Sequence, residues 1–181
     1  WQVADRHKTK IPHLCWLPEP GYRPDGNCRA CVVEIAGERT LAASCIRKPA
    51  AGMVVKSEGE RSEKARAMVF ELLQADMPAR AESPDPEANV WTRSEKVGID
   101  GSRYPSRHDR PAPRLDGRIT DPHAGGLDLH DASHSAIAVN IDACIACGLC
   151  ERACREVQVN DVIGMGFRGN DARPVFDLAD P

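Results

Sequence analysis

The stretch NIDACIACGLCERAC, residues 140–154, decides how the rest of this chain is interpreted. Its four cysteines have the spacing C-x2-C-x2-C-x3-C, which is typical of chains that bind cubane 4Fe-4S clusters. Three thiolates spaced two residues apart can surround one cluster, because a short loop turns their side chains inward while its backbone N–H groups point at the anionic sulfurs. The pattern therefore predicts three ligands of one 4Fe-4S cluster at Cys144, Cys147 and Cys150.

The fourth cysteine of the stretch, Cys154, has a different predicted role. If a helix begins near Leu149, Cys154 lies about one turn beyond Cys150, roughly 6 Å along the helix axis. We therefore expect Cys154 to bind a second 4Fe-4S cluster. No cysteine follows Cys154, so both clusters would need ligands from beyond Pro181. Because residues 1–7 have the pattern of a helix already under way, we expect the sequence to be truncated at both ends.

A second set of cysteines lies near the start of the chain, with the spacing C-x12-C-x2-C-x13-C. Two irons bridged by two sulfides need four thiolates from one compact surface, and a glycine-containing loop in a mostly β domain can supply them. Residues 32–35 and 40–43 are β-prone and are predicted to form a hairpin, to which residues 53–56 can add another strand. The pattern predicts a 2Fe-2S cluster, with the ligands Cys15, Cys28, Cys31 and Cys45.

Disulfide bonds and structural zinc are the alternative uses of eight cysteines. Disulfide frameworks spread cysteines between loops, whereas this chain has none between residues 46 and 143. A zinc ribbon needs two C-x2-C knuckles, and the first set has only the one formed by Cys28 and Cys31. A Rieske centre needs paired histidines, so His13 is interpreted as a packed or hydrogen-bonded loop residue. Iron is favoured, and thiolates that must stay reduced predict a cytoplasmic location.

The composition is that of a protein with a modest core. Of 181 residues, 41% are hydrophobic and 28% are charged, and the aromatic residues are three Trp, two Tyr and three Phe. Metal clusters would add the stability that so few large side chains cannot supply. A net charge of -3 does not favour nucleic acid as a partner, and no apolar run is long enough to span a membrane.

The middle of the chain is predicted to contain one long helix and then a linker. Between Ser57 and Pro78, an apolar stripe recurs with helical spacing and leaves Arg66 among the charged residues outside it; its members are Ala65, Met68, Val69, Leu72 and Leu73. A short helix is predicted around Trp91, and residues 100–133, rich in Pro, Gly, Asp and Arg, are interpreted as a linker.

The C-terminal region is predicted to form a short strand at 136–139, a helix at 149–157 and a hairpin made of 162–167 and 174–176. The glycines Gly164, Gly166 and Gly169 spell G-x-G-x-x-G, but this motif binds dinucleotides only where it opens a helix in a βαβ unit. We therefore exclude a nucleotide site here. The predicted fold class is α+β: a β-grasp 2Fe-2S ferredoxin-like domain (1–57), a helix and linker (58–135), and the first half of a 4Fe-4S ferredoxin-like domain (136–181).

Two stretches are specific enough to indicate a family. Residues 11–35, IPHLCWLPEPGYRPDGNCRACVVEI, resemble the opening cluster loop of the α subunit of cytosolic, molybdenum- or tungsten-dependent, NAD-linked formate dehydrogenase. Residues 153–165, ACREVQVNDVIGM, are similar to the ferredoxin-like segment of the same family, with Arg155 where simple ferredoxins have proline. The G subunit of complex I and the diaphorase small subunit of NAD-reducing hydrogenase have a similar front cluster loop.

The resemblance implies that this segment carries electrons and holds no catalytic residue. Formate would be oxidised at a molybdopterin-bound metal elsewhere in the α subunit. Electrons would pass through the clusters to a β subunit that binds FMN and NAD, and a small 2Fe-2S γ subunit would complete the complex. Arg29 and Arg155 adjoin predicted ligands and are candidates for tuning cluster potentials by charge. The alternatives are the hydrogenase diaphorase subunit and, in another class, a zinc-stapled interaction module.

Overall fold

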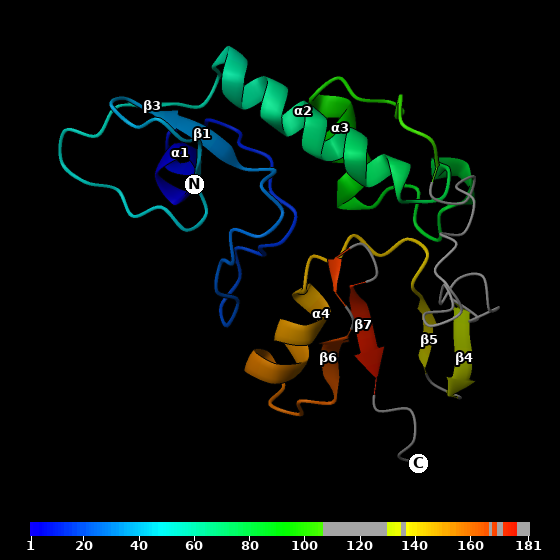
Figure 1. Ribbon diagram of the computed structural model, residues 1–181. Coiled ribbons are helices and arrows are strands. Elements are labelled where there is room, and N and C mark those ends of the chain that lie inside the picture. Colours follow the sequence, from blue (N-terminus) through cyan, green and yellow to red (C-terminus); the bar gives the residue numbers. More distant parts are fainter. Residues whose placement is uncertain (107–129, 135–136, 167, 170–171, 177–181) are drawn as a thin grey trace.

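The structure is a computed structural model, and it describes residues 1–106, 130–134, 137–166, 168–169 and 172–176. Its secondary structure is mixed, with short strands in small sheets and one long helix (Figure 1). None of the helices in these ranges is long and apolar enough to cross a membrane.

The N-terminal region is built around one buried strand. Helix α1 (Gln2–Arg6) precedes a three-stranded antiparallel sheet in which β1 (Val32–Ile35) lies between β2 (Ala42–Ala43) and β3 (Val55–Lys56). Val32 pairs with Ala43, and Ile35 pairs with Val55. The predicted bounds of β1 are confirmed, whereas β2 and β3 are shorter than predicted. The β-branched side chains of β1 are buried, as is expected of a central strand.

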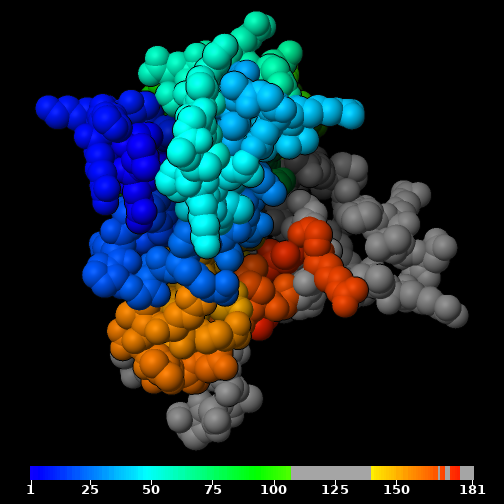
Figure 2. Space-filling view, turned by 90° about the vertical axis from the view of Figure 1, so that its left-hand side faces the viewer, coloured from blue at the N-terminus to red at the C-terminus, as the bar shows by residue number. Residues whose placement is uncertain are grey.

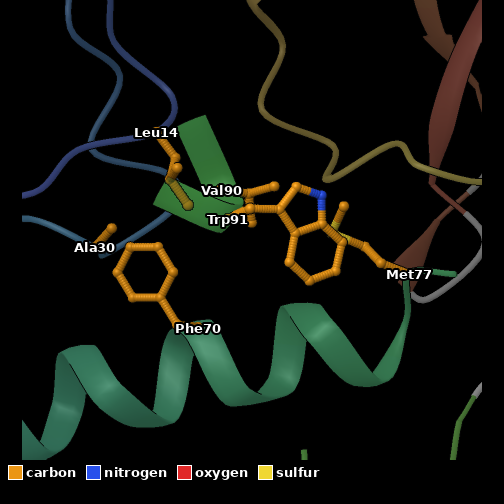
Figure 3. Close-up of a cluster of buried hydrophobic side chains, with 6 residues drawn as sticks. All are labelled: Leu14, Ala30, Phe70, Met77, Val90 and Trp91. Atoms are coloured by element: carbon orange, nitrogen blue, oxygen red, sulfur yellow. The ribbon is translucent and has the colours of Figure 1, made fainter. Parts of the chain in front are cut away.

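Two helices cover the cluster loops from one side. Helix α2 (Glu60–Ala75) crosses the sheet region, and α3 (Asn89–Lys96) packs against it (Figure 1). Their buried apolar side chains meet two residues of the cysteine loops, Leu14 and Ala30, and Figure 3 shows the ring of Phe70 projecting from α2 toward Ala30. The full cluster is Leu14, Ala30, Phe70, Met77, Val90 and Trp91.

The buried face of α2 differs from the predicted apolar stripe. Leu72, a member of that stripe, is 47% exposed, whereas Ser62, Arg66 and Phe70 are buried. The guanidinium of Arg66 donates from Nε to the carbonyl oxygen of Val32 at 3.0 Å and from Nη2 to that of Ser57. The face that packs on the cluster loops therefore includes a long polar donor, because loop carbonyls buried there need hydrogen bonds.

The predicted linker contains more structure than its composition indicates. Before it, the 3-10 turn η1 (Arg80–Glu82) leads to α3, the short helix predicted around Trp91, which packs into the core. At its end, strand β4 (His130–His134) pairs antiparallel with β5 (Ile137–Asn140). The prediction of a linker over residues 100–133 thus missed β4, because backbone pairing with β5 forms a strand from a polar stretch of low strand propensity. Residues 107–129 lie outside the described ranges.

The C-terminal region begins with the cysteine loop and ends in a hairpin. Helix α4 (Leu149–Arg152) continues into a π-helical turn, η3 (Ala153–Val157), and β6 (Ile163–Gly166) pairs antiparallel with β7 (Arg173–Phe176). Both the helix and the hairpin were predicted. The first two glycines of the G-x-G-x-x-G pattern lie in β6, and strand β7 follows, which is unlike a dinucleotide-binding turn.

Candidate iron-sulfur centres

The first set of cysteines comes together in the N-terminal region. Cys15 and Cys31 are each only 1% exposed, and Cys28 and Cys45 are half-buried. The backbone N–H of Cys15 donates to the sulfur of Cys28 at 3.4 Å, and the N–H of Cys28 donates to the sulfur of Cys15 at 3.3 Å. These reciprocal bonds hold the two ends of the loop between Cys15 and Cys28 side by side.

The four thiols form two hydrogen-bonded pairs. The thiol of Cys15 donates to Cys28 and lowers the pKa of Cys28 to about 6, and the thiol of Cys45 does the same for Cys31, whose pKa is also lowered to about 6. The same bonds, together with burial, raise the pKa values of Cys15 and Cys45. Cys15 also raises the pKa of Cys45 through charge, so the two pairs lie near each other.

This arrangement fits a 2Fe-2S cluster. Each iron of such a cluster takes two protein ligands, so two neighbouring pairs of thiolates match its needs. Backbone N–H groups of Leu14 and Ala30 point at the sulfur of Cys28, and that of Gly26 points at Cys45, which is how proteins stabilise negative charge on cluster sulfurs. Within the described ranges, no group of three or more ligand side chains could hold a single metal ion.

The second set of cysteines lies on one short, more open loop. Cys144 and Cys147 are half-buried and Cys150 is exposed. Burial raises the pKa of Cys147, and the nearby charges of Cys144 and Cys150 act in the same direction, so the three sulfurs share one region. Ala146 at φ +49° and Gly148 at φ +70° give the loop its tight turns, and the N–H of Ala146 points at the sulfur of Cys144 at 3.4 Å.

Cys154 lies apart from this loop, in the π-helical turn. It is buried, and its sulfur accepts a hydrogen bond from the backbone N–H of Val162 at 3.3 Å, at the approach to β6. The separate position agrees with its predicted role in another cluster. The individual ligand assignments of both sets stay predictions.

His13 is a packed loop residue, as expected. Its ring makes an edge contact with Trp1, at 4.8 Å between centroids, and a tilted one with Trp16. Nε2 of His13 lies 3.3 Å from Nη2 of Arg93. Burial, followed by the charge of Arg93, lowers the pKa of His13. These contacts pack His13 beside the first cysteine set.

The arginines beside the cysteines differ in how deeply they are buried. Arg29 is exposed, and Arg155 is an exposed residue that pairs with Glu151 at 2.9 Å and Asp161 at 2.6 Å. Sequence reasoning missed Arg152, which is buried and hydrogen-bonds to carbonyl groups of both cysteine regions. Nothing in the local sequence distinguishes Arg152 from Arg155, because the difference comes from the N-terminal loop that packs on it.

Comparison with known proteins agrees with the geometry of the first site. Residues 1–60 match a family described as a 2Fe-2S iron-sulfur cluster binding domain. This N-terminal region is a 2Fe-2S ferredoxin-like domain. The match covers all four cysteines of the first set and ends at the start of α2.

Longer relatives match almost the whole chain. The NADP-reducing hydrogenase subunit HndD of Solidesulfovibrio fructosivorans is 33% identical in an alignment 189 residues long, which covers 97% of this chain and 29% of HndD. The putative formate dehydrogenase YrhE of Bacillus subtilis is 24% identical in an alignment 182 residues long, which covers 99% of this chain and 17% of YrhE. The chain thus spans less than a third of either relative. The hydrogenase subunit is the more similar of the two, so the specific match to formate dehydrogenase is not confirmed.

A solved structure shares the fold. The crystal structure of an NAD⁺-reducing [NiFe]-hydrogenase in the H2-reduced state contains a chain that matches with a TM-score of 0.76 and 28% sequence identity. The match covers 97% of this chain and 67% of that chain. The likeness therefore extends beyond the 2Fe-2S domain to the helices and the second cysteine loop.

Proposed function

We propose that this chain is an electron-transfer iron-sulfur module of an oxidoreductase complex that exchanges electrons with a nicotinamide nucleotide. The observation that carries the proposal is the packing of two cysteine sites against each other. Figure 2 shows the N-terminal region (blue) lying directly on the segment around α4 (orange), so the segments that carry the two predicted cluster sites adjoin.

Side chains and backbone groups of the chain can stabilise the negative charge of a cluster at both sites. When bound, an iron-sulfur cluster accepts and releases one electron with little rearrangement. The cysteines supply the thiolates, and the backbone N–H groups aimed at Cys15, Cys28 and Cys144 stabilise negative charge on sulfur. The apolar side chains of Leu14 and Phe70 keep water from the buried side of the first site. No proton transfer or bond cleavage is required of this chain.

The hydrogenase relatives favour a place in a hydrogen-oxidising complex. HndD is the more similar of the two curated relatives, and the matching solved structure is also a hydrogenase. In such a complex, a flavin- and NAD(P)-binding subunit is the proposed partner on one side of the relay. A formate dehydrogenase with a molybdopterin site is the second candidate, which the similarity of residues 153–165 and the match to YrhE over nearly the whole chain support.

The first experiment tests the metal content. The chain is produced anaerobically, and its iron, acid-labile sulfide and zinc are measured together with its visible absorption and its electron paramagnetic resonance (EPR) spectrum after reduction. We expect a brown protein that contains iron and sulfide and gives a 2Fe-2S signal. A colourless protein that contains zinc would overturn the proposal and support a zinc-stapled interaction module.

A second experiment separates the two candidate complexes. A tagged copy of the chain is purified from its own cells with its partners, and NAD(P)⁺ reduction is measured with hydrogen and with formate as separate donors. Activity with hydrogen alone would support the hydrogenase, and activity with formate alone would support the dehydrogenase. The predicted cytoplasmic location is checked by fractionating the same cells.

A further inference from the structure

Arg152 lies between the two cysteine sites. It is only 4% exposed, and its guanidinium reaches groups on both sides of the boundary. Nη2 donates to the carbonyl oxygen of Cys147 at 2.9 Å, on the second loop, and to the carbonyl oxygen of Cys15, on the first. The same side chain also donates to the carbonyl oxygens of Arg23 at 2.9 Å and Gly148 at 3.1 Å. One residue therefore holds a predicted ligand of each cluster by its backbone.

Burying the charge of Arg152 costs free energy unless nearby negative charge compensates for the lost contact with water. Among the residues that the structure describes, Arg152 makes an ion pair with Asp25, whose Oδ2 lies 4.0 Å from Nη1 and whose side chain is partly exposed. Backbone carbonyls satisfy the N–H donors of a buried arginine, but they do not cancel its charge. Thiolate-bound iron-sulfur clusters are anionic, and a buried cation between two of them would be compensated by both.

Neighbouring contacts show that this boundary is closely packed. Arg23, from the first loop, pairs with Glu156, from the π-helical turn, at 2.6 Å. Gly21 has φ +92°, and a Cβ added to it would lie 3.1 Å from Cγ2 of Val157. The first loop thus follows the surface of α4 and η3 closely, with Arg152 as the buried contact and Arg23 as the exposed one.

We propose that Arg152 is a positioning residue that fixes the spacing of the two cluster loops and places one positive charge between the clusters. This inference rests on the proposed electron-transfer function. The fork of N–H donors sets the distance across which an electron passes, and the charge stabilises the reduced state of each cluster, because reduction adds a negative charge. Arg155, three residues further on, was predicted from the sequence to tune a cluster potential, but it is exposed and pairs with Glu151 and Asp161. Its charge is therefore screened and neutralised, and Arg155 serves as the control for a positive charge at the surface.

The test compares Arg152→Met, Arg152→Lys and Arg155→Met with the unaltered chain. Each protein is reconstituted anaerobically with ferrous iron, sulfide and excess dithiothreitol, whose thiol can complete a three-cysteine cubane. Midpoint potentials are obtained from the EPR signals during a redox titration, and magnetic interaction between the reduced clusters is measured in the same samples. Iron and sulfide contents confirm equal loading.

We expect Arg152→Met to shift the midpoint potential of the 2Fe-2S centre to more negative values and to weaken the magnetic interaction. Arg152→Lys keeps the charge but not the fork, so it should weaken the interaction with a smaller shift in potential. Arg155→Met should match the unaltered chain in both measurements. If Arg152→Met does not retain its clusters, Arg152→Lys decides, since a magnetic interaction equal to that of the unaltered chain would overturn the inference.

The outcomes separate this inference from the function on which it rests. An unaltered chain that binds no iron and sulfide would refute the electron-transfer function and the role of Arg152 together. An unaltered chain with both clusters, alongside an Arg152→Met protein that equals Arg155→Met in potential and in magnetic interaction, would refute only the role of Arg152.

Discussion

The two cysteine sites each bring several thiols together, but they do so in different ways. The second site takes three sulfurs from residues 144–150, a single loop whose compactness comes from its own backbone turns. The first site draws its sulfurs from residues 15–45, and they meet only because strands β1 and β2 and helix α2 hold the loops together. The first site is correspondingly more buried. The second site can thus be recognised from a short stretch of sequence, whereas the sulfurs of the first site come together only in the folded domain.

Removal of one thiol should have the largest effect and should separate the sites. In Cys28→Ser, the partner of Cys15 is lost, and one iron of the first site lacks a ligand. In the reduced complex, we expect the 2Fe-2S EPR signal to disappear while the cubane signals persist. Cys144→Ser is the matched variant in the second site and should have the opposite effect. Unchanged spectra in Cys28→Ser would reject the assignment of the first set.

Loss of the core side chain behind the first site should have the next largest effect. Phe70 is fully buried against Ala30, which lies between Cys28 and Cys31. Phe70→Ala should lower the free energy of unfolding by about 3–5 kcal/mol and speed the loss of the 2Fe-2S cluster. The measurement is anaerobic urea unfolding followed by circular dichroism and visible absorption.

The control for this variant is Leu72→Ala on the same helix. Leu72 is largely exposed, so its truncation should change the free energy of unfolding by less than about 1 kcal/mol. Equal losses in the two variants would show that the core behind the first site does not depend on the observed face of α2.

A smaller effect is expected from a glycine in the first cluster loop. Gly26 has φ +66°, and a Cβ there would lie 2.7 Å from Cδ1 of Ile46. Gly26→Ala should cost about 1–2 kcal/mol in backbone strain, and it should also weaken cluster binding because the N–H of Gly26 points at Cys45. Gly37→Ala has a similar φ of +83° and open space around it, so it should cost similar stability without cluster loss. Cluster retention after buffer exchange is the deciding measurement.

The smallest expected effect is a difference between the two sites in the rate at which their clusters are lost in air. Cys150 is exposed and the other two cysteines of its loop are half-buried, whereas Cys15 and Cys31 are buried. Exposure to air in the presence of a chelator should therefore bleach the cubane signal several-fold faster than the 2Fe-2S signal. A time course of EPR spectra from one sample measures both rates. Equal rates would show that burial does not distinguish the sites.

Much of the local structure could be predicted because its signals are local. Strand β1, the extent of α2 and the hairpin of β6 and β7 follow from β-branched runs, helical periodicity and turn residues. The buried face of α2 could not be predicted in the same way. Arg66 faces inward because the carbonyls of Val32 and Ser57 need donors, and those carbonyls belong to segments that the helix meets only in the folded chain.

The sequence alone determined that eight thiols fall into two sets, with spacings that match two kinds of iron-sulfur cluster. Spacing carries this information because a cluster is held by few residues at short range. Only the tertiary structure decided how the two sets are related. It paired the thiols of the first set, packed their loop on α4 and buried Arg152 rather than Arg155 between them. The packing on α4 and the burial of Arg152 depend on contacts between segments more than a hundred residues apart, and the local sequence of one segment does not predict its contact with the other.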